Sequence, residues 1–132
     1  MPQTDPSPQD QGSSGPSTGH HHVFERRIIQ LKRRLVREAT QAIGMLESAL
    51  DALWSLDVAS AKLVRAEDDQ VDREEVLIEQ ESFEILALQH VFARDFRMIA
   101  FILKVNADIE RVADHATGIA KMTSRISKNL PA

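Results

Sequence analysis

The chain has 132 residues, of which 42% are hydrophobic, and its formal net charge is -4. This length supports one modest core and is too short for two. The chain contains no cysteine, which excludes a disulfide framework and a thiolate metal site. The negative charge argues against a general affinity for nucleic acid, because a phosphate-binding surface needs an excess of cations.

The first residues are rich in Pro, Ser, Gly and Gln and show no apolar periodicity. Such a segment cannot offset the entropy of ordering, so we predict a disordered tail over 1–21 and a folded domain over 22–128. The adjacent histidines His20–His22 do not share one helical face, and we interpret them as part of the tail or of a helix entry. With no secretory signal pattern and no apolar window near 18 residues, we expect a soluble cytoplasmic protein that meets membranes only through partners.

Apolar residues recur three and four positions apart from Phe24 onward, which predicts a long amphipathic helix ending near Trp54. The pattern consists of Phe24, Ile28, Leu31, Leu35, Ala39, Ala42, Leu46, Ala49 and Leu53. We interpret Trp54 as a plug at the end of the core. Residues 55–57 supply a short turn, in which Asp57 is suited to be the N-cap of a second helix.

Strict heptad spacing marks the second helix, which we expect to run to about His90 and to carry Val64, Val71, Ile78 and Ile85. The same rhythm predicts a third helix from about Ala93 to about Ile126. We therefore predict an all-α fold, an antiparallel up-down-up three-helix bundle. Because the second connection has no Gly or Pro, one continuous helix through "LQHVFARDF" stays open as an alternative, and such a rod would have to pair with other chains.

Acidic side chains form a stripe on the second helix and another on the third. The stripes consist of Asp68, Asp72, Glu75 and Glu79 on the second helix and of Glu110 and Asp114 on the third. If the chain reverses near Val91, Glu110 comes level with Arg73 and Asp114 with Asp69, so the two stripes face each other. Spacing alone leaves two interpretations open: a solvated or salt-bridged surface, or a site for a divalent metal, since carboxylates are ligands for Mg, Mn, Fe and Zn.

Nearer the reversal the same two flanks become apolar. The residues concerned are Phe83, Leu86, Phe92, Phe96, Ile99 and Leu103. A three-helix bundle buries one seam per helix, so we expect this second flank to be exposed and to form an interface with a partner.

The stretch "LALQHVFARDFRMIAFILKVNADIERVADHATGIAK" resembles the PhoU family of phosphate-transport regulators. The family's repeat has an Asp-Leu-Arg-like element, then an Asn, then a Glu-Arg-Ile-Gly-Asp-like element. Here these are "DFR" at residues 95–97, Asn106, and "ERVAD" at residues 110–114. The segments "AEDDQVDREEVLIEQESFEILA" and "VFERRIIQLKRRLVREA" resemble the family's second and first helices, so the match covers about residues 22–127.

The resemblance implies a PhoU-like three-helix bundle with multinuclear metal binding through Glu110 and Asp114. Asp68, Asp72 and Glu75 are our geometric candidates for completing the site, with Fe, Zn, Mn or Mg as the ion. The resemblance further implies that the protein is an adaptor and not an enzyme. Such an adaptor couples a phosphate ABC transporter ATPase to a sensor histidine kinase, and it restrains phosphate uptake and phosphate-starvation signalling.

Family members usually carry two tandem bundles, and this chain has one. The resemblance therefore implies that two copies pair as a homodimer to mimic the tandem six-helix form. Two alternatives stay open: a structural helical module without metal, and a regulatory domain linked to a sodium-phosphate cotransporter. A ferritin-like di-metal enzyme is disfavoured, because the sequence has no E-x-x-H motif.

Overall fold

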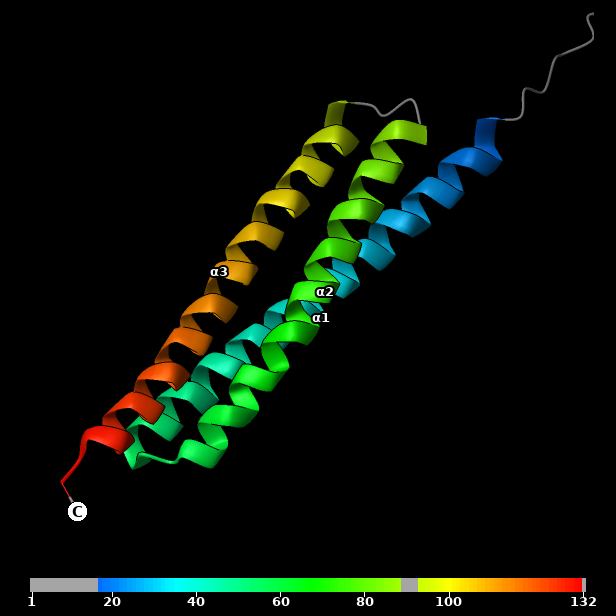
Figure 1. Cartoon of the computed structure of the whole chain (residues 1–132). Coiled ribbons are helices and arrows are strands. Elements are labelled where there is room, and N and C mark those ends of the chain that lie inside the picture. Colours follow the sequence, from blue (N-terminus) through cyan, green and yellow to red (C-terminus); the bar gives the residue numbers. More distant parts are fainter. Residues whose placement is uncertain (1–16, 89–92, 132) are drawn as a thin grey trace, which may run out of the picture.

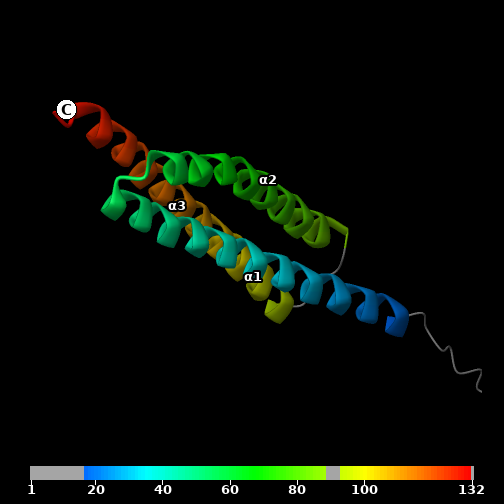
Figure 2. The same cartoon turned by 90° about the horizontal axis from the view of Figure 1, so that it is seen from below.

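Three helices form one elongated bundle in the computed structural model, which describes residues 17–88 and 93–131. They are α1 (Ser17–Ser55), α2 (Val58–Leu88) and α3 (Ala93–Asn129). The helices lie side by side, with α2 running opposite to α1 and α3 (Figures 1 and 2). The predicted all-α, up-down-up bundle is confirmed, and the continuous-helix alternative is wrong because α2 and α3 pack against each other. Within the described residues, no helix is long and apolar enough to cross a membrane.

The predicted end of α1 and the predicted starts of α2 and α3 hold to within one residue, whereas the predicted end of α2 near His90 lies outside the described residues. The two outer ends of the bundle differ from the prediction. α1 begins at Ser17, so its first turn occupies residues that we assigned to the tail, and His20–His22 lie inside the helix. α3 continues to Asn129, three residues beyond the predicted end. Residues 1–16 of the predicted tail, and residues 89–92 of the second connection, lie outside the described residues.

The first reversal is a compact turn made by the backbone of Leu56 and Asp57. The Leu56 amide donates to the Leu53 carbonyl at 3.3 Å and the Asp57 amide to the Ala52 carbonyl at 2.9 Å. This is the Schellman pattern, in which one residue takes a left-handed conformation, here Leu56 with φ 52°. Asp57 then caps α2, because its Oδ1 accepts the Ser60 amide at 3.1 Å. The predicted N-cap is confirmed.

The core is built from the inner seams of the three helices. On α2 the predicted heptad residues are all buried, with at most 2% of their surface exposed. On α1 the buried seam is Phe24, Ile28, Leu31, Leu35, Glu38, Ala42, Met45, Ala49 and Ala52. The prediction named Ala39, Leu46 and Leu53 instead of Glu38, Met45 and Ala52. Ala39 and Leu46 are partly buried against the core, and Leu53 is also only partly buried.

Several sequence interpretations of large apolar residues need correction. Trp54 is 93% exposed and is no core plug. Ile99, which we placed on the exposed flank, is fully buried in the core, since it lies on the inner seam of α3 with Ile102. Leu86 and Leu103 are partly buried against that core. Phe83 and Phe96 are about half exposed, as expected for the flank, whereas Phe92 lies outside the described residues.

Candidate metal centre

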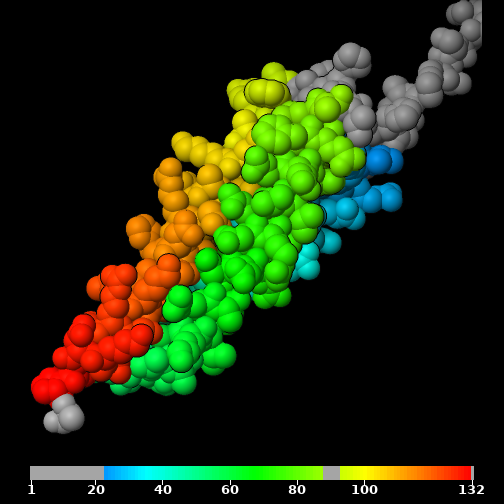
Figure 3. Space-filling view, in the orientation of Figure 1, coloured from blue at the N-terminus to red at the C-terminus, as the bar shows by residue number. Residues whose placement is uncertain are grey.

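The two acidic stripes meet where α2 and α3 pack side by side. Figure 3 shows these two helices in contact along the bundle. One group joins Asp68 and Asp72 of α2 with Asp114 of α3, and a second joins Asp72 and Glu75 with Glu110. Within each group, one carboxylate oxygen from every residue lies within 4.8 Å of the others. The five residues selected as candidates from the sequence are thus the five that the structure brings together.

Asp72 belongs to both groups and links them into one continuous cluster. The arrangement follows from helix geometry, because residues three or four apart on α2 repeat on one flank and meet the one-turn pair on α3. The predicted level pairing of Glu110 was one or two residues off: Glu110 was expected beside Arg73 and lies beside Asp72 and Glu75. Glu79, the fourth member of the α2 stripe, is exposed and belongs to neither group.

A buried amide fixes the register between the two helices. Asn106 is 2% exposed and its Nδ2 donates to the backbone carbonyl of Glu75 at 3.0 Å. A helix carbonyl has a second lone pair, so this bond adds a contact without breaking the α2 ladder. Since Glu110 is one turn beyond Asn106, the same bond sets the height at which Glu110 meets Asp72 and Glu75.

Several oxygens of this cluster are buried without a hydrogen-bond partner. They are Asp68 Oδ1, Asp72 Oδ1 and Glu110 Oε2, together with Asn106 Oδ1 and Thr117 Oγ1 beside them. None of the five carboxylates forms an ion pair with a Lys or Arg of the described chain. Buried acceptors of this kind carry a desolvation penalty that a cation or a proton would relieve. The donor set therefore fits a hard divalent metal.

The pKa values of the cluster reflect the same unfavourable burial of neighbouring carboxylates. Burial, and then a hydrogen bond shared with Asp72, raises the pKa of Glu110 to about 9. Burial is also the largest cause of the raised pKa of Asp68, followed by the charges of Asp72 and Asp114. The pKa of Glu75 is raised mainly by burial, against a hydrogen bond with Glu110 that lowers it. Closely spaced carboxylates cannot all ionise without a counter-charge, so the raised pKa values favour retention of a proton in the cluster when no cation is bound.

The arginines of α1 neutralise a different set of acids. Arg27 pairs with Glu81 at 3.0 Å and with Glu84 at 3.4 Å, and Arg34 pairs with Glu74 at 2.8 Å. These pairs lie on the α1 side of α2 and include no residue of the two acidic stripes, so they are not the salt-bridged alternative that the sequence left open for the stripes. Asp68, Asp72 and Glu75 are on the α3 side and are left out of these pairs.

Glu38 is an acidic residue near this level that the sequence analysis missed. It is 1% exposed, and both carboxylate oxygens lack a partner. Burial, and then the charges of Glu75 and Glu74, raises the pKa of Glu38 to about 7. The available signal was its position three residues after Leu35 and four before Ala42, which is a core position of the helix pattern.

Cations do approach one end of the cluster. Lys62, Arg65 and Lys121 line a cavity of about 490 Å³ together with Asp68 and Thr117. His115 is exposed and belongs to neither carboxylate group, and His90 lies outside the described residues. The nearest cations of the described chain are thus exposed side chains at the Asp68 end of the cluster.

Comparison of the sequence with models of known protein families gives a result that agrees with this bundle and its acidic flanks. The model of the "PhoU domain" family matches residues 35–123. The chain belongs to the PhoU family, whose members are accessory proteins and not enzymes. The resemblance seen in the sequence is thereby confirmed.

Curated relatives give the same picture. A protein of Xylella fastidiosa is 31% identical over 118 residues, which cover 87% of this chain and 49% of the relative. A protein of Clostridium acetobutylicum is 30% identical, covering 80% of this chain and 48% of the relative. Both are named phosphate-specific transport system accessory protein PhoU homolog. The chain spans about half the length of these relatives, and no solved structure gives a significant match to it.

Proposed function

We propose that this chain is a metal-binding regulator of phosphate uptake and phosphate-starvation signalling. The observation that carries the proposal is the cluster of five carboxylates on α2 and α3, with buried oxygens and no basic partner in the described chain. The names of its relatives support the link to a phosphate-specific transport system. Membership of an accessory family supports a role through contacts with other proteins.

Asp68, Asp72 and Asp114 would hold one ion, and Asp72, Glu75 and Glu110 a second. The ion would supply the positive charge that cancels the repulsion between α2 and α3, and its binding would displace the proton held at Glu110. An all-oxygen donor set suits Mg, Mn or Fe, and Zn also accepts carboxylates. Thr117 and Asn106 would support the ligands from the two ends of the cluster.

The partners proposed are the ATPase of a phosphate ABC transporter and a sensor histidine kinase, with the chain as an adaptor between them in the cytoplasm. Because the chain spans about half of its relatives, we also propose that a second copy takes the place of their remaining half. Phe83 and Phe96 offer exposed apolar surface beside the second connection for contacts with such partners.

The direct test is the metal content of the purified protein and of two matched variants. Asp72→Asn removes the residue shared by both groups, whereas Glu79→Gln alters an exposed acid on the same helix. Elemental analysis after dialysis should find metal in the parent and in Glu79→Gln, and little in Asp72→Asn. A parent protein that takes up no Fe, Zn, Mn or Mg would overturn the metal-binding part of the proposal.

One observation favours the second candidate, a helical interaction module without metal. With the pKa of Glu110 at about 9, the cluster can remain partly protonated at neutral pH, so the fold does not require an ion. That candidate predicts identical metal content in all three proteins, together with a gain in stability for Asp72→Asn through relief of repulsion.

A further inference from the structure

α1 carries a second apolar seam on the surface that faces away from the core. Ile29, Val36, Ile43 and Leu50 are spaced every seven residues. Their exposed fractions are 49%, 64%, 53% and 49%, in chain order. Heptad spacing of large apolar residues is the pattern by which one helix packs along another. Since the inner seam of α1 already fills the core, this outer seam has no partner within the described part of the chain.

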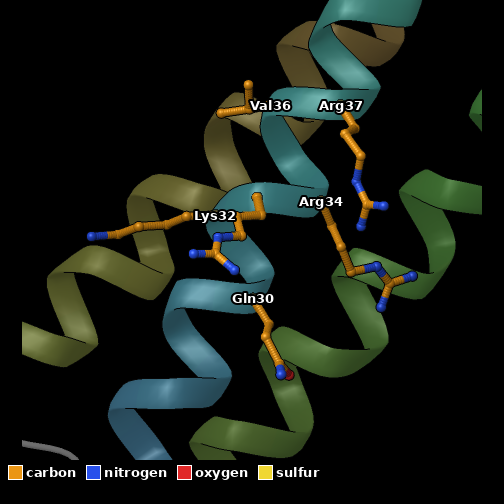
Figure 4. Close-up of a pocket in the computed structure, with 6 residues that line it drawn as sticks. Gln30, Lys32, Arg34, Val36 and Arg37 are labelled. Atoms are coloured by element: carbon orange, nitrogen blue, oxygen red, sulfur yellow. The ribbon is translucent and has the colours of Figure 1, made fainter.

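The outer seam lies on the side of α1 that is next to α3. Ion pairs of Arg27 and Arg34 fix the opposite side of α1 against α2. Figure 4 shows Arg34 and Arg37 extending toward α2, whereas Lys32 extends the other way, past α3. On α3, Phe101 is 60% exposed and Met122 is 49% exposed. The outer seam is therefore the periodic apolar surface that α1 itself presents.

The charges beside the seam are divided between the two halves of the helix. Exposed cations predominate in the first half, where Arg26, Lys32, Arg33 and Arg37 outnumber the exposed acid Glu25. The second half presents the exposed acids Glu47 and Asp51. A single helix face with opposite charges at its two ends is self-complementary when two copies run in opposite directions, and is self-repelling when they run in the same direction.

We infer that α1 is the docking surface for a second copy of this chain, which packs antiparallel along the outer seam. A two-fold axis between Val36 and Ile43 brings each of these residues level with the other in the second copy, and brings Ile29 level with Leu50. The same symmetry places Lys32 and Arg33 of one copy beside Glu47 of the other. The seam from Ile29 to Leu50 is about 32 Å long at 1.5 Å per residue, which is sufficient for a helix-pairing interface.

This inference deepens the self-association proposed above and assigns it to a surface other than the Phe83 and Phe96 flank. It leaves the carboxylate cluster outside the contact, because the cluster lies between α2 and α3. Metal content measured on the same samples therefore separates a failure of this inference from a failure of the proposed metal site.

Analytical ultracentrifugation of the full chain over a concentration series tests the surface. The parent should form dimers. The double variant Val36→Asp and Ile43→Asp should raise the dissociation constant at least about tenfold, a change that corresponds to about 1.4 kcal/mol. The control is Val76→Asp, since Val76 is 50% exposed on α2 and should be neutral. Circular dichroism of each variant checks that the helices remain folded.

Cross-linking tests the direction of packing. Because the chain has no native cysteine, only the introduced cysteines can form a disulfide. A mixture of the Ile29→Cys and Leu50→Cys variants should form a disulfide-linked dimer under mild oxidation, while each variant alone should form little. Self-linked Ile29→Cys would show parallel packing and overturn the arrangement. Three results would overturn the assignment of the interface to α1. They are a monomeric parent, a double variant Val36→Asp and Ile43→Asp that dimerises as the parent does, and dissociation of the dimer by Phe83→Asp instead.

Discussion

Glu38 sits where the inner seam of α1 calls for an apolar side chain. Its neighbours along the seam, Leu35 and Ala42, are buried, and so is Glu38 itself. Neither Arg34 nor Arg37 forms an ion pair with it in the described structure, and Arg34 pairs with Glu74 instead. A buried carboxylate without a partner stabilises no contact that would offset its loss of hydration. The structure therefore identifies Glu38 as a source of instability at neutral and alkaline pH.

We predict that Glu38→Met raises the free energy of unfolding by about 2–3 kcal/mol at pH 8, given that one pKa unit is worth about 1.4 kcal/mol. Methionine has a similar length and removes the charge. The gain should shrink near pH 5, where Glu38 is protonated in the native state. Urea unfolding at both pH values measures it, with the exposed Glu47→Met as the control. A Glu38→Met protein that is less stable than the parent at pH 8 would contradict the assignment.

Asp72 and Asp114 differ in how many carboxylate groups they join, and this difference is measurable. Asp72 lies in both groups, whereas Asp114 lies only in the group with Asp68. We predict that Asp114→Asn retains part of the bound metal, because Asp72, Glu75 and Glu110 remain together. Asp72→Asn should lose nearly all of it. Isothermal titration with Mn²⁺ gives the stoichiometry, and equal losses in the two variants would argue against two linked ion positions.

At the scale of the helices, the packing of α2 against α3 is where hydrophobic attraction and carboxylate repulsion oppose each other. The buried seams of both helices, with Ile78 on α2 and Ile102 on α3, favour contact. The facing acids oppose it wherever they are ionised. Without a bound ion, protonation of Glu110 relieves part of this repulsion, because its pKa of about 9 lies far above the ordinary value of 4.5.

The sign of the pH dependence follows from this shift. Between about pH 5 and pH 9 the folded state binds more protons than the unfolded state, because the pKa values of Glu110 and Glu38 are raised on folding. The free energy of unfolding of the metal-free protein should therefore fall as the pH rises through this window and level off above it. Thermal unfolding in chelator over this range measures the effect.

Two variants provide the controls for this dependence. Glu110→Gln should remove the decline above pH 7 and about half of the decline below it, whereas Glu38→Met should reduce only the decline below pH 7. A metal-free parent whose stability is constant or rises between pH 6 and pH 9 would show that the carboxylates are solvated in solution.

At the scale of the whole molecule, metal binding and the pH dependence both change global stability, because an ion bound to the folded state stabilises all three helices at once. Binding at a hundred times the dissociation constant adds about 2.7 kcal/mol for one site. We predict that Mn²⁺ or Fe²⁺ raises the unfolding temperature of the parent, more strongly near pH 8 than near pH 6, because fewer protons then compete with the ion for the carboxylates. Differential scanning calorimetry with and without the ion measures this rise. Asp72→Asn should show no such rise, and a parent that shows none would count against a metal site in the bundle.

The sequence predicted the three helices, and it placed the five carboxylates on two helix flanks that meet in the structure. Periodic apolar residues, such as Val64, Val71, Ile78 and Ile85, fix which side of a helix is buried, and Asp57 marks the start of α2. Once two helices are joined by a short connection, their level residues follow from the rise per residue. The pairing of Glu110 with the α2 acids was therefore accessible within one turn.

What the sequence alone determined is local: helix periods, the cap at Asp57, the acidic flanks and the family resemblance, all of which depend on spacing along one chain. Only the tertiary structure decided that Ile99 belongs to the core, that Trp54 is exposed, that Glu38 is buried without a partner and that α1 has a second apolar seam. These depend on the rotation of each helix about its axis. A rotation of a few tens of degrees exchanges core and flank positions, and it is set by the packing of all three helices together.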